Sequence, residues 1–514
     1  MVQRRPLHYK QVSISDKSIH LNPSPMKLPV FTLCALASTS LLTFADVTVS
    51  TLFSDHMVIQ RDIAAPVWGQ ASPGEEISVR LGGGIATKAT TDAKGNWSLK
   101  IPAQKANASG QELEIRGKNT VAFKDVLVGD VWVCSGQSNM EWTLGGCNAP
   151  DDIKAADFPW LRRIKFNHVS LLKPSMQVPS GGWEACTPQT AGNFTAVGFY
   201  FAKRIQKEIG VPIGLLDDNW GGCRIEPWIP TAGFELEPSL APMLADLKKR
   251  DEASASLPDN APGDGGQPST MYNGMLHCVV PFGIKGALWY QGESNGGEGD
   301  EYAAKMRALV GGWRKIWNQG DFPFYYVQLA NFEKITEDPA GGDGWARHRM
   351  AQLQSLSIPN TGMAVIIDVG EGPDIHPKNK FDVGERLAAW ALHDTFGKKD
   401  VVPSGPLFKE MKIDGNKAVI SFNHLGGGLM VGKKEGREPT KADASGKLQR
   451  FAIAGEDKKW VWADAVITGD TVVVSSPEVP KPVAVRYAFS MHPAGCNLYN
   501  KAGLPASPFR TDNW

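Results

Sequence analysis

Four polar, glycine-containing segments of this chain hold the residue types that acyl transfer requires. The first contains Ser138, shortly after an apolar run over residues 126–134, and the last contains His376 with Asp374 two positions before it. Acyl transfer needs a nucleophile, a base that takes its proton, a group that orients the base, and donors for the developing oxyanion. We predict the first three roles for Ser138, His376 and Asp374, in that order.

The two middle segments offer donors for the oxyanion. Gly222 follows Trp220 and Gly221, and a glycine lets the backbone approach a ligand closely. Gln291 adds a side-chain N–H. We predict that the backbone N–H groups of Ser138 and Gly222 bind the oxyanion and that Gln291 assists. The two glycines also suit a tight turn, so the prediction depends on the four segments meeting in space.

Three further polar residues in these segments are candidates for binding substrate: Asn139, Arg224 and Glu293. Arg224 suits an acidic substrate, but a surface ion pair explains it equally well. Glu293 is either a second acid or a carboxylate that fixes the backbone of its own loop. Both alternatives remain open at the level of the sequence.

The elements that must position these residues alternate between strands and helices from residue 126 to about residue 397. This alternation indicates an α/β fold with a parallel sheet covered on both faces. Ligands bind beyond the carboxyl ends of such strands, so the polar segments should meet at one edge. The predicted strands cover residues 126–134, 212–216, 286–290, 324–329 and 363–367. The predicted helices cover residues 199–209, 302–317, 346–356 and 383–395.

Short strands separated by turns dominate on either side of this region, as in β-sandwich-like domains. We therefore predict an N-terminal β-domain over 46–125, a catalytic domain over 126–397 and a C-terminal β-domain over 398–514. Residues 251–270 are rich in Ala, Ser, Pro, Asp and Gly. They predict a long surface loop, either a substrate-side lid or a disordered insertion.

The composition excludes some classes of partner. The 514 residues have a formal net charge of zero, so no overall field favours nucleic acid or an anionic membrane. No CxxC pair or HExxH sequence is present, so we predict no metal and no cofactor. Residues 1–45 have the character of a secretory signal peptide with a mis-set upstream start, which predicts a secreted or periplasmic protein without a membrane span in the mature chain. Six cysteines follow that leader, and the sequence leaves their pairing open.

Four motifs resemble the sialate O-acetylesterase family, which belongs to the SGNH/GDSL-type hydrolases and is related to the acetylxylan esterases. They are residues 135–140 (SGQSNM), 220–222 (WGG), 289–294 (WYQGES) and 374–377 (DIHP). Residues 272–275 (YNGM) and 498–510 are also similar, and the resemblance extends from Leu52 to the C-terminus.

The resemblance implies a three-layer parallel-sheet SGNH-type core. It implies Ser138 as nucleophile, His376 as base, and Gly222 and Gln291 at the oxyanion, and it adds Asn273 as a candidate for substrate binding. Two departures from the wider superfamily concern the acid and the third motif. The superfamily has its acid three residues before the histidine, where this chain has a proline, and it has Gly-x-Asn-Asp where this chain has Gln-Gly-Glu. A Ser–His dyad is therefore an alternative to a triad with Asp374.

We expect a carbohydrate O-acetylesterase that acts on O-acetylated sugars of the sialic acid type. Acetylated xylan or another plant polysaccharide is the alternative substrate. A non-catalytic carbohydrate-binding protein is the alternative from another class. The expected partner is an acetylated carbohydrate, with no nucleic acid, and the oligomeric state stays open.

Overall fold

The structure of the protein is a computed structural model that describes residues 46–444 and 446–514. The predicted signal peptide, residues 1–45, lies outside the described residues. Among the described helices, none combines the length and apolar character that a membrane span requires. All six cysteines of the described part are free, and its His, Cys, Asp and Glu side chains form no cluster of three that could hold a metal ion.

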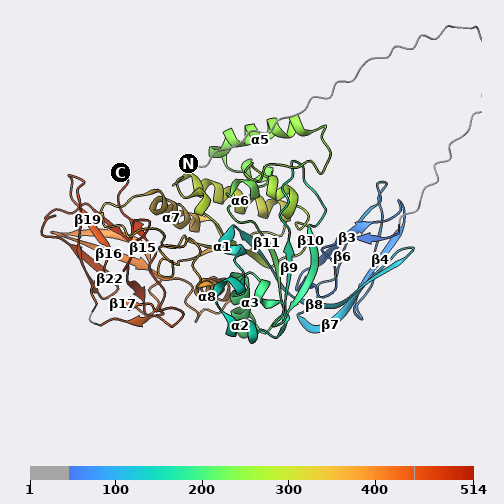
Figure 1. Cartoon of the computed structure of the whole chain (residues 1–514), viewed down its shortest axis with the longest axis horizontal. Coiled ribbons are helices and arrows are strands. Elements are labelled where there is room, and N and C mark those ends of the chain that lie inside the picture. Colours follow the sequence, from blue (N-terminus) through green and yellow to red (C-terminus); the bar gives the residue numbers. More distant parts are fainter. Residues whose placement is uncertain (1–45, 445) are drawn as a thin grey trace, which may run out of the picture. The chain divides into compact units, whose positions relative to one another are not determined.

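The central sheet supports the candidate site, and Figure 1 shows its strands in the middle of the chain. Its main strands are β8 (Thr120–Gly136), β9 (Phe158–Phe166), β10 (Ser180–Cys186), β11 (Ile213–Asn219), β12 (Gly286–Tyr290), β13 (Phe324–Val327) and β14 (Thr361–Ala364). They lie in the order β10-β9-β11-β8-β12-β13-β14. Neighbours from β9 to β14 pair in parallel, and β10 pairs with β9 in antiparallel fashion.

The helices connect these strands. The α-helices are α1 (Ser138–Glu141), α2 (Pro150–Lys154), α3 (Ala196–Ile209), α4 (Thr231–Phe234), α5 (Ala241–Ser254), α6 (Glu301–Trp317), α7 (Gly344–Gln354) and α8 (Lys380–Trp390). The short 3-10 and π turns are η1 (Leu144–Cys147), η2 (Ala191–Asn193), η3 (Glu226–Trp228), η4 (Pro238–Leu240), η5 (Tyr272–Leu276), η6 (Glu293–Asn295), η7 (Ser355–Ser357) and η8 (Ala391–Thr395). The four predicted helices correspond to α3, α6, α7, and α8 with η8. The α/β prediction is confirmed at this level.

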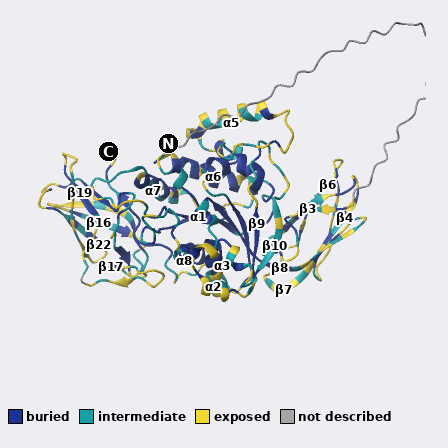
Figure 2. Cartoon of the chain, viewed as in Figure 1, coloured by how far each residue is buried: buried dark blue, intermediate teal, exposed yellow. Residues whose placement is uncertain are grey.

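Apolar clusters cover both faces of the sheet. Successive residues of a strand point to opposite faces, so neighbours along β8 belong to different clusters. Along β8, Val131 and Val133 join the cluster that contains Trp313 of α6. Trp132 and Cys134 join the cluster that contains residues of α3 and α8. Figure 2 shows the middle strands of the sheet, such as β11, as buried. Burial on both sides explains the largely apolar sequence of residues 126–134, in which the buried Asp130 pairs with Arg61 at 2.9 Å.

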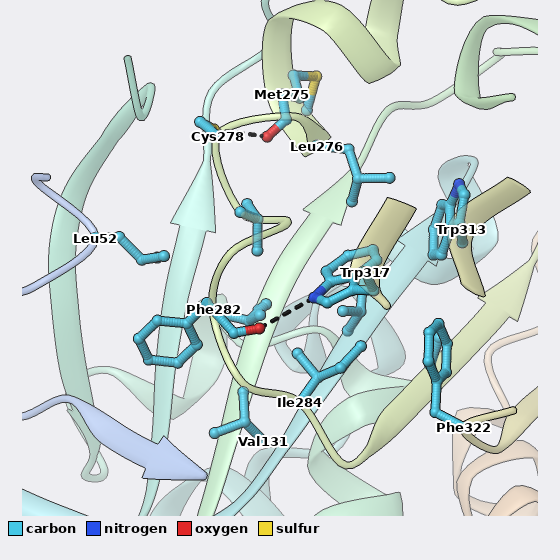
Figure 3. Packing of buried hydrophobic residues seen from close by; sticks show 14 of the residues in the cluster. Leu52, Val131, Met275, Leu276, Cys278, Phe282, Ile284, Trp313, Trp317 and Phe322 are labelled. Carbon is cyan, nitrogen blue, oxygen red and sulfur yellow. Dashed lines mark hydrogen bonds between the residues drawn. The ribbon is translucent and has the colours of Figure 1, made fainter. Parts of the chain in front are cut away.

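Figure 3 shows packing on the α6 side of the sheet. Trp317 donates its indole N–H to the carbonyl oxygen of Phe282 at 3.0 Å. The Cys278 thiol lies 3.0 Å from the carbonyl oxygen of Met275. These contacts give partners to polar atoms that are buried in an apolar cluster. The Trp317 hydrogen bond attaches the segment before β12 to α6, and the Cys278 contact lies within that segment.

The sequence did not predict β9 and β10. Charged residues interrupt the apolar pattern of β9, yet Arg162 and Arg163 are buried there. Arg162 pairs with Asp125 at 2.6 Å, and Arg163 pairs with Asp217 at 3.3 Å. Their acidic partners come from other strands or strand ends, so the compensation for their burial is invisible in the local sequence.

The N-terminal strands are β1 (Thr48–Val49), β2 (Val58–Gln60), β3 (Ala65–Gln70), β4 (Glu76–Leu81), β5 (Thr87–Thr90), β6 (Asn96–Ile101) and β7 (Asn107–Arg116). Strands β1, β3 and β6 form a separate sheet, whereas β2 and β7 pair with β8. Strand β8 therefore continues across the predicted boundary at residues 125 and 126. The three predicted domain ranges stay predictions.

The C-terminal strands are β15 (Leu407–Asp414), β16 (Lys417–Asn423), β17 (Leu429–Lys433), β18 (Lys441–Ala442), β19 (Phe451–Ala454), β20 (Trp460–Trp462), β21 (Asp464–Thr468), β22 (Thr471–Ser475), β23 (Ala484–Tyr487), β24 (Leu498–Asn500) and β25 (Phe509–Arg510). They form three sheets. Lys434 pairs with Asp382 of α8 at 2.7 Å, and Tyr499 donates its hydroxyl to Asp368 at 3.2 Å. This β-region thus contacts the segment that contains His376 on both sides of that residue.

The predicted loop over residues 251–270 is partly helical, since its first four residues complete α5. The rest is held by backbone hydrogen bonds to residues 170–172. Gly263 donates its N–H to Ser170 at 2.9 Å, and Leu172 donates to Ala261 at 3.0 Å. These contacts give the segment a defined conformation, and its role as a substrate-side lid stays a prediction.

Candidate active site

A tight turn between β8 and α1 presents Ser138. Gly136 ends β8 with φ of 132°, a conformation that L side chains rarely adopt. A Cβ atom at this position would lie 2.2 Å from the carbonyl oxygen of Tyr290. Gln137 donates its backbone N–H to the same oxygen at 2.9 Å. The end of β12 therefore supports the turn from which the serine projects.

His376 contacts the serine directly. Its Nε2 lies 2.8 Å from Ser138 Oγ, although the two residues are 238 positions apart in the chain. Trp142 stacks on the imidazole at 4.6 Å between ring centroids and an interplanar angle of 17°. The His376 side chain is 24% exposed, so solvent and a ligand can reach it. This geometry suits transfer of the serine proton to the imidazole.

Asp374 lies beside the other imidazole nitrogen. Its Oδ1 is 3.4 Å from His376 Nδ1 and accepts the backbone N–H of His376 at 2.9 Å. That backbone hydrogen bond lowers the pKa of Asp374, and Lys378 at 3.2 Å adds to the effect. Burial lowers the pKa of His376, and the charge of Lys380 acts in the same direction. At neutral pH the imidazole is therefore in the form that accepts a proton.

Two backbone N–H groups are available near the serine. Ser138 begins α1, so its N–H has no partner within the helix. In the described part of the chain, neither this N–H nor that of Gly222 has a hydrogen-bond acceptor. Gly222 has φ of 73°, and a Cβ atom there would meet nothing within 4 Å. The neighbouring Gly221 instead donates its N–H to Glu141 Oε2 at 2.7 Å, which ties the glycine turn to α1.

The side-chain amide of Gln291 already has hydrogen-bond partners within the chain. The side chain is fully buried, and its Nε2 lies 2.7 Å from Asn295 Oδ1, 3.1 Å from Gln137 Oε1 and 3.2 Å from the Cys223 carbonyl oxygen. An amide nitrogen has two hydrogens, so these acceptors leave none for an oxyanion. Gln291 instead joins the loops after β8, β11 and β12.

Asn139 and Glu293 also face inward rather than toward solvent. Asn139 is 1% exposed, and its Nδ2 donates to Glu293 Oε1 and to the carbonyl oxygen of Ile375 at 3.0 Å. Lys380 donates to Asn139 Oδ1. The carboxylate of Glu293 thus accepts a hydrogen bond from Asn139 of a neighbouring loop, and both readings of Glu293 stay predictions.

Arg224 and Asn273 have partners within the chain. Arg224 pairs with Glu226 at 3.0 Å and with Glu298, and its side chain is 43% exposed. Asn273 is buried and donates to the carbonyl oxygens of residues 171 and 172 at 3.2 and 3.0 Å. Asn273 therefore fixes the segment around residue 171, and nothing in these contacts directs it toward Ser138.

The sequence missed three residues that contact the site: Glu141, Trp142 and Lys380. Glu141 follows Ser138 by three positions, and this helical spacing places both on one side of α1. That signal was available. Trp142 and Lys380 gave no local signal, because their roles depend on the segment around His376 packing against α1.

Comparisons with known proteins agree on one family. A family model described as carbohydrate esterase, sialic acid-specific acetylesterase, matches residues 128–393. The sialate O-acetylesterases of Rattus norvegicus and Homo sapiens are each 27% identical to this chain over 90% of its length, and the matches cover 93% and 91% of those proteins. The crystal structure of a carbohydrate acetylesterase from Xanthomonas citri is similar with a TM-score of 0.80 and 38% identity. That match covers 91% of this chain and 100% of the other.

Proposed function

Because this chain belongs to the family of sialic acid-specific acetylesterases and is a carbohydrate O-acetylesterase, we propose that it acts through a serine acyl-enzyme with Ser138 as nucleophile. The observation that carries the proposal is the 2.8 Å contact between Ser138 Oγ and His376 Nε2. Ser138 Oγ attacks the acetyl carbonyl carbon, and His376 takes its proton.

The backbone N–H groups of Ser138 and Gly222 hold the oxyanion that forms on the acetyl oxygen. His376 then gives its proton to the departing sugar oxygen, which leaves an acetyl group on Ser138. Water attacks this ester with His376 again as the base, and acetate and free serine result. Asp374 orients the imidazole, and its 3.4 Å distance from Nδ1 makes this contact weaker than that of His376 with the serine. We assign Gln291 to the support of the surrounding loops.

We further propose that the catalytic core is the three-layer parallel-sheet arrangement of SGNH-type hydrolases, with β-domains at both ends. The parallel pairings from β9 to β14 and the apolar clusters on both faces support this. Export through the leader at residues 1–45 belongs to the same proposal.

The first substrate candidate is an O-acetylated sialic acid, in line with the names of the mammalian relatives. The second is a neutral acetylated sugar such as acetylated xylan. One observation favours the second: Arg224 and Lys378 already pair with carboxylates of this chain, so neither is a free cation for the carboxylate of a sialic acid.

Because the matching family model and the mammalian relatives are named for sialic acid, we expect purified protein to release acetate from O-acetylated sialic acid with a higher kcat/KM than from acetylated xylan. Acetate release at matched acetyl concentrations measures the ratio. The reverse ratio would assign the enzyme to neutral sugars and would leave the serine mechanism untouched. Release from neither substrate would contradict the proposed function itself.

Glu141 gives a test of the oxyanion assignment. We expect Glu141→Ala to lower kcat by about 10²-fold with a smaller change in KM, because the turn at Gly222 loses the hydrogen bond that fixes it. Glu141→Gln keeps an oxygen that accepts the Gly221 N–H and should retain most of the activity. Steady-state kinetics on an acetyl ester measure both. Equal losses in the two variants would show that the charge of Glu141, rather than this hydrogen bond, is what matters.

A further inference from the structure

Three buried polar side chains, joined in series by hydrogen bonds, lie beneath Ser138 and His376. Lys380 donates to Asn139 Oδ1, and Asn139 Nδ2 donates to Glu293 Oε1. Lys380 is fully buried and Asn139 nearly so. None of the three has a role in the acyl-transfer steps derived above.

Asn139, the middle member of this hydrogen-bonded series, joins the loop of Ser138 to the loop of His376. Asn139 directly follows Ser138, and it donates to the carbonyl oxygen of Ile375, which directly precedes His376, at 3.0 Å. Its side chain therefore links the backbone neighbour of the nucleophile with the backbone neighbour of the base. Because Lys380 and Glu293 hold opposite ends of the Asn139 amide, they fix its orientation.

The burial of Lys380 calls for an explanation, since an isolated ammonium in an apolar interior is costly. Its Nζ lies 5.2 Å from the ring centroid of Tyr290, in cation–π range. The other carboxylate oxygen of Glu293, Oε2, is buried without a hydrogen-bond partner. An apolar residue at position 380 would avoid the cost of burying a charge. The presence of a lysine there points to a use for its charge at the site.

Resting on the serine mechanism proposed above, we propose that Lys380 is a positioning residue for it. Through Asn139 it fixes the position of the Ser138 loop relative to the His376 loop. Its positive charge also disfavours protonation of His376. The base thereby stays in its proton-accepting form under more acidic conditions.

The titratable groups that interact with Lys380 come from several elements. Burial lowers the pKa of Lys380 to about 8, while Cys147, Glu293, Glu371 and Asp374 act in the opposite direction. The ammonium form therefore still dominates at neutral pH. Its charge is present under the conditions in which the base must work.

The groups that face His376 set the sign of the expected effect. Burial lowers the pKa of His376, Lys380 and Lys378 lower it further, and Asp374 raises it. Trp142, which stacks on the imidazole, is uncharged. His376 accepts a proton only when neutral, so activity is lost as the pH falls through its pKa. Removing the Lys380 charge should raise that pKa and move the acidic limb to higher pH.

The test is the pH profile of kcat/KM for Lys380→Met in the full chain, measured on an acetyl ester. We expect the acidic limb to move to higher pH by roughly half a unit or more, together with a lower plateau kcat. Lys412→Met removes a lysine that is 73% exposed on β15 and should leave the profile unchanged. A folded Lys380→Met protein with a wild-type acidic limb would overturn the proposal.

Asn139→Ala leaves Lys380 and Glu293 in place and removes the amide that links the two loops and binds both side chains. We expect its kcat to fall roughly tenfold with KM near the wild-type value, because the two reactive groups lose their mutual register. If Lys380→Met gives no folded protein, this variant decides, and a wild-type kcat would refute the positioning role. Failure of the serine mechanism is distinguishable, since it would appear as activity that survives loss of Ser138.

Discussion

Replacing Ser138 with alanine should lower kcat on an acetyl ester by at least about 10⁴-fold, because the acyl-enzyme can no longer form. The His376 imidazole would lose the hydroxyl that lies 2.8 Å from it, while the backbone N–H groups of the glycine turn would remain. Initial rates with 4-nitrophenyl acetate, together with the circular dichroism spectrum, measure the activity and the fold of the variant.

Ser135→Ala is the matched control for this substitution. Ser135 lies three positions earlier, is fully buried, and its hydroxyl has no hydrogen-bond partner. Its removal breaks no hydrogen bond, so most of the activity should remain. Wild-type turnover in Ser138→Ala would end the nucleophile assignment. Equal losses in both variants would point to a disturbed turn instead of a missing nucleophile.

Replacing Gly136 with alanine should destabilise the protein and abolish most of its activity. The new Cβ would lie 2.2 Å from the Tyr290 carbonyl oxygen, and φ of 132° is unfavourable for any L side chain. Strain and overpacking together should lower the free energy of unfolding by at least about 2 kcal/mol. Denaturant titration measures this change, and the ester assay reports the displacement of Ser138.

A variant of Gly210 distinguishes the effect of backbone strain from that of overpacking. Gly210 directly follows α3 with φ of 72°, and a Cβ atom there would meet nothing within 4 Å. Gly210→Ala should therefore cost only about 1 kcal/mol, from backbone strain alone, and should retain activity. A similar loss of stability in both variants would contradict the claim that close contact with β12 is what requires glycine at position 136.

Much of the core was accessible to sequence reasoning because its signals are local. The strand predicted at residues 286–290 coincides with β12, and the helix predicted at 302–317 differs from α6 by one residue. Apolar periodicity follows from which face of an element is buried, so it can be read within a short window. The missed strand β9 marks the limit, since its buried arginines find their acidic partners far away in the chain.

The sequence by itself determined the family resemblance, the strand and helix alternation, and the choice of Ser138 and His376, because these depend on residue types and spacing. Only the tertiary structure decided which polar side chains face the solvent. Nothing in the sequence distinguishes Gln291, Asn139 and Glu293 from surface residues. In the structure their side chains form hydrogen bonds that join the loops beneath the site. The physical reason is that the direction of a polar side chain depends on partners that folding brings from distant positions, and no local pattern records them.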